Sequence, residues 1–514
     1  MKPTNVAVLT ALGMLFTSVS VYSLTPPGGI AWQRGGADVG SGGVVPEQVG
    51  TVKVGDAQPQ PDISRFTAGS TLMIDGRIGN AKLARSSNGE TFIMLEARGG
   101  DGLAARSAAP VNLSLVIDRS GSMKGTRIRN AISAATSAVD RLSDGDVVNV
   151  VTFDTQTQVV VAPTTIEPGA RERVNAAIRG ITLGGDTCIS CGLEEGMSLL
   201  GRTSGKVSRM LLLSDGDANH GVRDVPGFRG IAQRAQTRGV SVTTIGVDVD
   251  YNEKIMAAIA QDSNGRHYFV ENDSGLTRVF EEEAQSLTRT VATNAEATIE
   301  LAPGVELSRV FDRSFRRSGN QVIVPLGAFS GTEVKTVLLK VRVPSGREGV
   351  APVASVDLGY RDLVSGADGR CSGKLALEVV ADAAQATELD PVVNGRVQRT
   401  ETAAVLKDAN TLFEQGKVEE ARRRLSAREA TLRSAADKAR STPGGARAKD
   451  VNSDFDRQIA AVGPENPFRN EPQFAQPPPA AGKPSPAAPA PAQESRAGKS
   501  AVRKNAEQAL PFAF

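Results

Sequence analysis

The sequence has few aromatic residues and histidines, and no excess of charge of one sign. Phe, Trp and Tyr make up 4% of the chain, and 59 Lys and Arg residues are nearly balanced by 57 Asp and Glu residues. Proteins that bind nucleic acids usually carry a clear basic excess, and those that bind single strands also stack aromatic side chains on the bases. We therefore expect no nucleic acid among the partners.

Signatures of catalysis are also missing. The only histidines, His220 and His267, stand in separate segments, which argues against a catalytic zinc site. The sequence contains no G-x-S-x-G nucleophile elbow, no Walker loop and no G-x-G-x-x-G after a strand. We therefore expect that the protein is not an enzyme.

Long apolar runs are confined to the N-terminus. Lys2 is followed by an apolar run from Val6 to Ser23, with small residues near its end. This pattern is typical of a secretory signal peptide, with cleavage after Ser20 or Ser23. An uncleaved membrane anchor is the alternative, since the run approaches the ~20 residues that a spanning helix needs. Either interpretation predicts export, to the periplasm, the cell surface or the medium.

Composition and periodicity divide the rest of the chain into segments. With 514 residues there is room for two or three domains of ~100–200 residues each. The segments that we expect are a signal peptide or membrane anchor (1–23), a disordered spacer rich in Gly, Pro and Gln (24–63), strands that pair with a later β unit (64–110), an α/β domain (111–293), an antiparallel β unit (294–382), a helical hairpin (383–440) and a disordered tail rich in Pro and Ala (441–514).

The α/β domain is predicted from strand and helix patterns that alternate. The runs RMLLLS and VSVTTIGV are apolar throughout, as expected of parallel strands that are buried on both faces. Such alternation predicts a doubly wound, mainly parallel sheet with right-handed crossovers. From Ala295 to Ala381 the period changes to two, which predicts antiparallel strands. We expect these to form one sandwich with the strands at 64–110, so that the α/β domain is inserted between them.

The helical hairpin is predicted from two apolar stripes within residues 397–440, separated by a break at Gly416. The segment ANTLFEQGKVEEARRRL resembles one tetratricopeptide-like repeat. Such repeats need about three copies to be stable alone, and only one is recognisable in this sequence. We therefore interpret it as a docking hairpin and not as a peptide-binding array.

One short segment combines a buried strand with a cluster of small oxygen ligands. In VNLSLVIDRSGSM, an apolar run from Val111 to Ile117 leads into a turn that carries Asp118, Ser120 and Ser122. Alternate positions after a strand can converge on one point, and such oxygen ligands suit a hard cation such as Mg²⁺. Open α/β sheets also bind ligands at the carboxyl ends of their strands. The alternative is a turn in which these side chains cap the next helix.

Two later segments favour the metal interpretation. LGGDTCISCG, at residues 183–192, is a Gly-rich loop that places Thr187 just before a helical pattern. RMLLLSDGDANHG, at residues 209–221, is an apolar run that ends at Asp215. Polar residues near these segments could shape the rim of a site, but we interpret them as ordinary turn residues: Asp154, Asp217, Asn219 and His220.

Together the three segments resemble the von Willebrand factor type A domain and its metal-ion-dependent adhesion site, over residues 111–292. The resemblance implies that Mg²⁺, or Mn²⁺, is held while one coordination position is left for an Asp or Glu carboxylate of a partner protein. The β segments on either side also resemble those of inter-alpha-trypsin inhibitor heavy chain-like proteins. The coordinating residues implied are Asp118, Ser120, Ser122, Thr187 and Asp215.

The cysteines allow two interpretations. Cys188 and Cys191 form a CxxC motif beside Thr187, whereas Cys371 stands alone in the late β unit. A CxxC motif at a helix start can act as a thiol–disulfide switch, because this position lowers a thiol pKa. In an exported protein it can instead form a local disulfide that holds the loop. We favour the local disulfide.

These observations predict an exported, non-enzymatic binding module that captures a partner carboxylate through Mg²⁺, in adhesion or in assembly of the bacterial envelope. Two alternatives remain. One is a thiol–disulfide redox protein that uses Cys188 and Cys191, and the other is a structural envelope protein that is merely stabilised by metal.

Overall fold

The computed structural model describes residues 62–100, 110–201, 206–271, 273–331, 333–441, 447–469 and 495–513. The signal peptide or anchor expected at residues 1–23 lies outside these ranges, as does nearly all of the expected spacer. In the described part of the chain, no helix is both long enough and apolar enough to cross a membrane.

The α/β domain is built on a six-stranded sheet with the order β10-β9-β8-β5-β6-β7. Neighbouring strands are parallel, except that the edge strand β7 is antiparallel to β6. The doubly wound fold predicted from the sequence is thereby confirmed. The strands are β5 (Val111–Asp118), β6 (Val147–Phe153), β7 (Thr157–Thr165), β8 (Val207–Ser214), β9 (Ser241–Val247) and β10 (His267–Val270).

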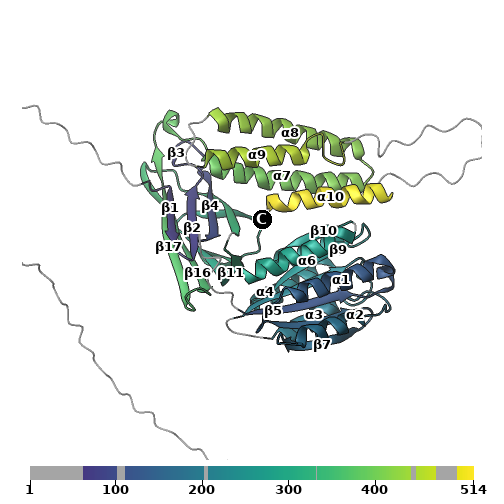
Figure 1. The fold of residues 1–514 in the computed structure, drawn as a ribbon. Helices are drawn as coiled ribbons and strands as arrows, with labels where there is room; N and C mark the ends of the chain where they lie inside the picture. The colour runs from purple at the N-terminus through teal and green to yellow at the C-terminus, as the bar shows by residue number, and fades with distance from the viewer. Residues whose placement is uncertain are drawn as a thin grey trace, which may run out of the picture. The chain divides into compact units, whose positions relative to one another are not determined.

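Helices cover both faces of this sheet (Figure 1). Along the central strand β5, Leu115 packs into the core on one face and Val116 into the core on the other, and both are fully buried. This alternation explains why the strand is apolar throughout. The helices are α1 (Thr126–Asp140), α2 (Ala170–Arg179) and α6 (Asp273–Thr288) on one face, and α3 (Ile189–Leu200), α4 (Val225–Thr237) and α5 (Glu253–Asp262) on the other.

The sandwich consists of two sheets, with the orders β1-β2-β4-β15-β12 and β13-β14-β11-β16-β17-β3. Its strands before the α/β domain are β1 (Arg65–Gly69), β2 (Leu72–Ile78), β3 (Lys82–Ala84) and β4 (Glu90–Gly99). The strands after it are β11 (Thr290–Leu301), β12 (Glu306–Phe311), β13 (Arg316–Ser318), β14 (Gln321–Ser330), β15 (Val334–Arg342), β16 (Gly349–Asp362) and β17 (Asp368–Val380).

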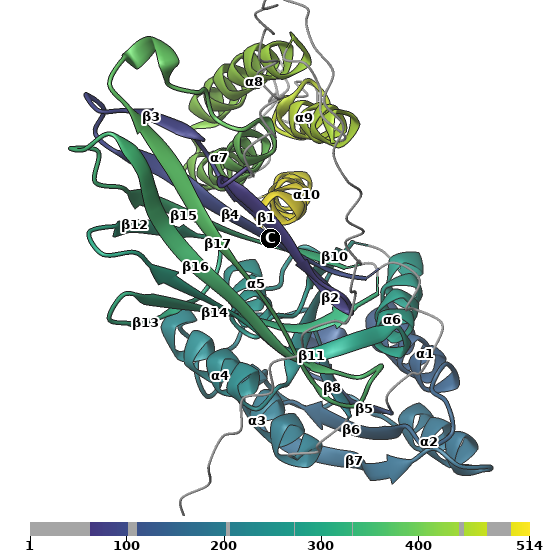
Figure 2. The same ribbon diagram turned by 90° about the vertical axis from the view of Figure 1, so that its left-hand side faces the viewer.

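Strands from both sides of the α/β domain pair directly in this sandwich. β4 is antiparallel to β15, with Ile93 opposite Leu339, and β3 is parallel to β17. Figure 2 shows the purple strands β2 and β4 beside the green strands that follow the α/β domain in the sequence. The α/β domain is thus inserted between strands of one sandwich, which has a continuous apolar core of its own.

The C-terminal region is helical well beyond the predicted hairpin, which corresponds to α7 (Pro391–Glu414) and α8 (Val418–Ser441). The expectation of a disordered tail over residues 441–514 is wrong for α9 (Ala448–Val462) and α10 (Arg496–Ala513). Both helices share an apolar core with α7 and α8. The Phe413 ring on α7 stacks at 4.5 Å on that of Phe468, which follows α9. The hairpin therefore does not stand alone, because later helices complete its core.

Candidate metal centre

The polar residues predicted to bind metal lie at the carboxyl edge of the α/β sheet. β5 ends at Asp118, and Ser120 and Ser122 follow in a turn and a short 3₁₀ helix (Gly121–Met123). β8 ends just before Asp215. β5 and β8 are parallel neighbours, with Ile117 opposite Leu213, so their ends bring these side chains to one place.

Hydrogen bonds connect the predicted ligands from the two strands. The Ser122 hydroxyl donates to Asp215 Oδ1 at 2.7 Å and lies 3.0 Å from the Ser120 hydroxyl. The Asp118 carboxylate accepts from the Ser120 amide at 2.8 Å and from the Ser214 hydroxyl at 2.5 Å. Asp118 is fully buried whereas Ser122 is exposed, so the cluster reaches from the domain interior to solvent.

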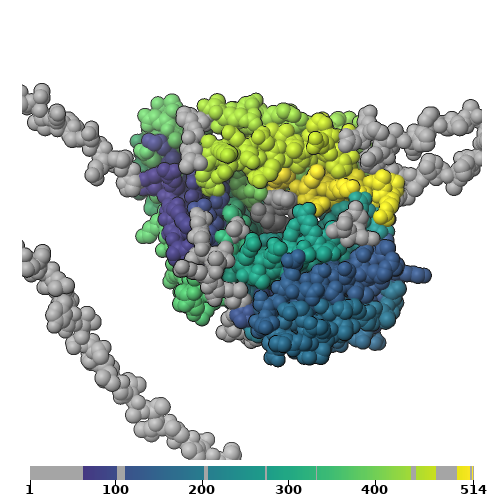
Figure 3. Space-filling view, viewed as in Figure 1, coloured from purple at the N-terminus to yellow at the C-terminus, as the bar shows by residue number. Residues whose placement is uncertain are grey.

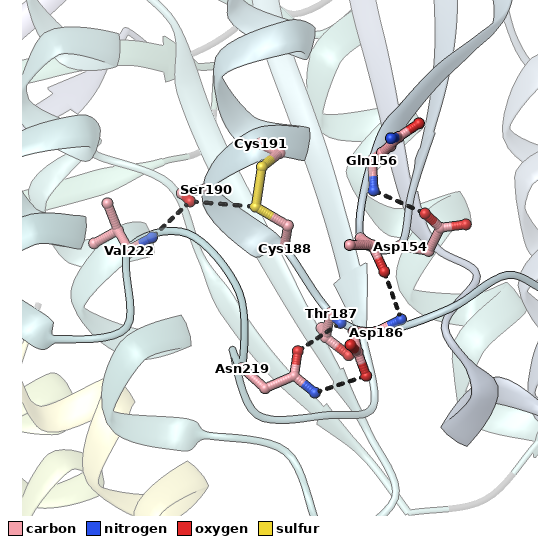
Figure 4. Close-up of a disulfide and its surroundings, with 10 residues drawn as sticks. Asp154, Gln156, Asp186, Thr187, Cys188, Ser190, Cys191, Asn219 and Val222 are labelled. Carbon is pink, nitrogen blue, oxygen red and sulfur yellow. Dashed lines mark hydrogen bonds between the residues drawn. A yellow bond between two sulfur atoms is a disulfide. The ribbon is translucent and has the colours of Figure 1, made fainter.

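Thr187 faces the same small space from a third segment. A Cβ atom added to Gly216 would lie 3.5 Å from Thr187 Oγ1 and 3.5 Å from Ser122 Oγ. Glycine therefore leaves open a space that both hydroxyls border. The Thr187 amide donates to Asn219 Oδ1 at 2.8 Å (Figure 4). Asn219, interpreted from the sequence as a turn residue, thus holds the Thr187 loop in place.

A disulfide joins Cys188 and Cys191 at the start of α3, directly after Thr187 (Figure 4). Cys188 is fully buried, and a Cβ on Gly221 would lie only 2.7 Å from its sulfur. Redox-active cysteines are usually accessible, so this burial favours a structural bond. The Cys188 amide also donates to Asp154 O at 2.8 Å, which ties the disulfide to the end of β6.

Burial makes the charged form of the two carboxylates in the cluster less favourable. Burial raises the pKa of Asp118 to about 6, against hydrogen bonds from Ser120 and Ser214. Burial also raises the pKa of Asp215, against hydrogen bonds from Ser122 and Arg127. A nearby cation stabilises the charged form of a buried carboxylate, so a positive charge is favourable at this site.

An arginine and an aspartate that the sequence did not point to border the cluster. Arg127 Nη1 donates to Asp215 Oδ2 at 2.7 Å and to the Ser122 carbonyl at 2.8 Å, and its Nη2 pairs with Asp248. The other oxygen of Asp248 pairs with Arg496 of α10 at 2.8 Å. Arg127 lies in the first turn of α1, where a basic residue opposes the helix dipole. The sequence does not single out Arg127 on this ground, because Arg129 lies in the same turn.

The donor set fits a hard cation. It consists of carboxylate and hydroxyl oxygens, which Mg²⁺ and Mn²⁺ accept. Among the described residues, no group of three or more His, Cys, Asp or Glu side chains is arranged to hold a metal. A cation at this edge would therefore depend on the hydroxyls of Ser120, Ser122 and Thr187 as well as on the two carboxylates.

Comparison with known proteins gives the family of this domain. Residues 112–282 match the family model of the von Willebrand factor type A (VWA) domain. Residues 112–282 are a VWA domain. Proteins with VWA domains generally act in interaction or adhesion and not as enzymes.

Similarity extends beyond the VWA domain. An uncharacterized protein of Synechocystis sp. is 28% identical over 57% of this chain and 70% of its own length. Inter-alpha-trypsin inhibitor heavy chain H4 of Homo sapiens is 25% identical over 58% of this chain, which spans only 31% of that relative. A solved VWA structure from Catenulispora acidiphila has a TM-score of 0.62 and 18% identity, covering 77% of this chain and 91% of its own. That coverage shows a shared fold that includes parts outside the VWA domain.

Proposed function

We propose that the protein is an exported, Mg²⁺-dependent binding module that captures a carboxylate of a partner protein, in adhesion or in envelope assembly. The observation that carries this proposal is the cluster at the carboxyl edge of the VWA sheet. There, the hydroxyls of Ser122 and Thr187 border one space, and the exposed Ser122 opens it to solvent. Hydrogen bonds connect the buried carboxylates of Asp215 and Asp118 to Ser122 and Ser120.

The ligand chemistry explains why a carboxylate would be captured. Ser120, Ser122 and Thr187 would hold the cation through neutral oxygens, while Asp118 and Asp215 would supply negative charge. When bound, Mg²⁺ would act as a Lewis acid toward oxygen ligands. Asp118 already accepts hydrogen bonds on both of its oxygens, from Ser120 and Ser214. With few anionic ligands of its own, the site favours an external carboxylate.

Two features support export. The N-terminal run from Val6 to Ser23 has the pattern of a signal peptide or anchor. The disulfide between Cys188 and Cys191 is of a kind that persists in oxidising compartments and is rare in the cytosol. Fractionation of the producing cells tests this part of the proposal, since it predicts that the protein is recovered with the envelope or the medium.

A capture experiment tests the binding function. The full-length protein, immobilised, is incubated with an envelope extract in Mg²⁺ or in chelator, with and without an acidic peptide as competitor. We expect specific partners that are retained only in Mg²⁺ and displaced by the peptide. Thr187→Ala should abolish retention, whereas the exposed Thr165→Ala should retain the same partners. Retention that is insensitive both to chelator and to Thr187→Ala would contradict the proposal.

A further inference from the structure

A second polar site lies between the VWA domain and the sandwich, at the amino end of the VWA strands and away from the metal centre. It is a cavity of about 320 Å³, lined by Arg209 near the start of β8, Arg266 just before β10, and Arg313 and Lys335 of the sandwich. Ala257 and Ala260 of α5 form an apolar part of its wall. Its volume is at the lower end of the range of ~300–1,000 Å³ that is typical of small-molecule sites.

Positive charge exceeds negative charge around this cavity. Glu283 pairs with Arg209 at 2.7 Å and with Arg266 at 3.3 Å. Glu333 pairs with Arg266 at 3.5 Å and with Lys335 at 3.6 Å. These two carboxylates are thus shared among cations other than Arg313. The cavity keeps an excess of positive charge that its own acidic residues do not balance.

Among the four cations that line the cavity, Arg313 is the one that forms no ion pair with any residue that the structure describes. Its Nε donates to the Thr336 carbonyl at 2.6 Å, and within the described part of the chain it makes no other hydrogen bond and no ion pair. The neighbouring Asp312 carboxylate is engaged elsewhere, because it accepts a hydrogen bond from Thr400 of α7 at 2.9 Å. Most of the Arg313 fork is therefore available to a ligand in the cavity.

Burial makes this excess charge unfavourable without a counter-ion. It lowers the pKa of Arg313 to about 10, against the opposing effect of Glu333 and Asp312. Burial also lowers the pKa of Lys335 to about 8, although the negative charge of Glu333 acts in the opposite direction. Cations that are removed from water are normally paired with anions, and an arginine fork matches the oxygens of phosphate and carboxylate groups.

We propose that this cavity binds the oxyanion group, phosphate or carboxylate, of a small molecule, with Arg313 as its main ligand. Arg266 flanks the same space. Lys335 Nζ already donates to the Leu326 and Ala328 carbonyls at 2.8 and 2.7 Å, so it contributes mainly charge. The ligand would contact both the VWA domain and the sandwich. This site is separate from the metal centre, and the inference does not depend on metal binding.

Calorimetric titration of the full-length protein tests this site, with inorganic phosphate and succinate as probes. Chelator is present, so that the metal centre plays no part, and chloride keeps the ionic strength constant. We expect saturable binding of at least one probe. Binding of phosphate alone would show that the cavity accepts phosphate groups, and binding of succinate as well would show that it also accepts carboxylates. Arg313→Gln should weaken the binding by about tenfold or more, the loss expected for a charge-assisted hydrogen bond.

Arg317→Gln is the matched control, because Arg317 is exposed on β13 and does not line the cavity. It should bind as the wild type does. A readout that needs no variant is the melting temperature of the wild type, which should rise with phosphate or succinate but not with chloride at equal ionic strength. No saturable binding of either probe, or equal binding by Arg313→Gln, would overturn the proposal.

Discussion

At the scale of single residues, the buried carboxylates of the candidate metal centre accept hydrogen bonds from hydroxyls and from one arginine. Arg127 donates to Asp215 and pairs with Asp248, so a positive charge already lies beside the space that the hydroxyls border. This charge repels an incoming cation and competes with it for Asp215. The same contact also orients Asp215. Arg127 can therefore weaken metal binding through its charge or favour it by positioning Asp215.

We predict that Arg127→Gln binds Mg²⁺ more tightly than the wild type, by up to about tenfold. One unit charge at a short distance near the protein surface contributes on the order of a few kcal/mol, part of which solvent screens. Titration calorimetry of both proteins measures the difference. Arg129→Gln is the control, because Arg129 is exposed on the same helix. Weaker binding by Arg127→Gln would instead show that Arg127 mainly positions Asp215.

His267 provides a prediction about pH. Its Nδ1 lies 2.9 Å from the Thr244 hydroxyl, and its Nε2 lies 3.1 Å from the Tyr251 hydroxyl. Burial, and then the charge of Arg503, lower the pKa of His267 to about 3. In the unfolded chain a histidine has a pKa of about 6.5. As the pH falls through 6.5 the unfolded chain takes up a proton that the folded protein does not, so stability is lost.

From pH 7 to pH 5 this loss amounts to about 2 kcal/mol. His267→Gln lacks the titrating group, so between these pH values the wild type should lose about 2 kcal/mol more stability than the variant. Urea unfolding at both pH values measures the free energies. The exposed His220→Gln should follow the wild type. Parallel pH profiles for the wild type and His267→Gln would contradict the prediction.

At the scale of secondary-structure elements, α10 connects the helical region to the VWA domain (Figure 3). Arg503 pairs with Glu253 at 3.0 Å, donates to the Tyr251 carbonyl at 2.8 Å and lies over the Tyr251 ring at 4.9 Å. Its side chain is 16% exposed, whereas that of Lys499, which pairs with Asp250, is 45% exposed. The two cations of one helix therefore differ in burial.

We predict that Arg503→Ala lowers the free energy of unfolding by about 2 kcal/mol, because a partly buried ion pair, a hydrogen bond and a cation–π contact are lost together. Lys499→Ala should change it by less than ~0.5 kcal/mol, as is usual for exposed pairs. Chemical denaturation of the two variants measures both effects. Equal losses would indicate that burial does not govern the contribution of these pairs.

The elements differ in how far the sequence predicts them. β5 and β8 are recognisable because all of their residues except Ser208 are buried on one face of the sheet or the other. The predicted ligands follow directly in the chain, Ser120 and Ser122 after β5 and Asp215 after β8. α9 and α10 were missed because the Pro- and Ala-rich segment between them dominates the composition. Their apolar residues form a core only together with those of α7 and α8, which the local sequence pattern does not reveal. The contacts of Asp215 and Asp248 with Arg127 were missed because they join segments 88 and 121 residues apart.

At the scale of the whole molecule, the chain leaves the sandwich after β4 and returns to it at β11, with the VWA domain between. The sandwich and the VWA sheet have separate apolar cores. Ile93 is fully buried in the sandwich core, and Leu115 is fully buried in the VWA core. Damage to one core should therefore leave local geometry in the other intact.

We predict that Ile93→Ala and Leu115→Ala each cost ~2–5 kcal/mol of stability, through lost burial and a cavity. Below its unfolding transition, Ile93→Ala should bind Mg²⁺ as the wild type does. Leu115→Ala should bind more weakly, because β5 carries Asp118 at its end. Calorimetry combined with denaturant unfolding measures both properties. Loss of Mg²⁺ binding in folded Ile93→Ala would show that the sandwich shapes the candidate metal centre.

Metal binding at the carboxyl edge of the VWA sheet is the central claim, and a Mg²⁺ titration of the full-length protein by calorimetry tests it most directly. The titration is made with and without glutarate as a stand-in for the partner carboxylate. We expect saturable binding that is lost in Asp118→Ala and Ser120→Ala and kept in Asp217→Ala, an exposed aspartate of the adjoining loop. No saturable binding even with glutarate, or equal binding by Asp118→Ala, would contradict the claim.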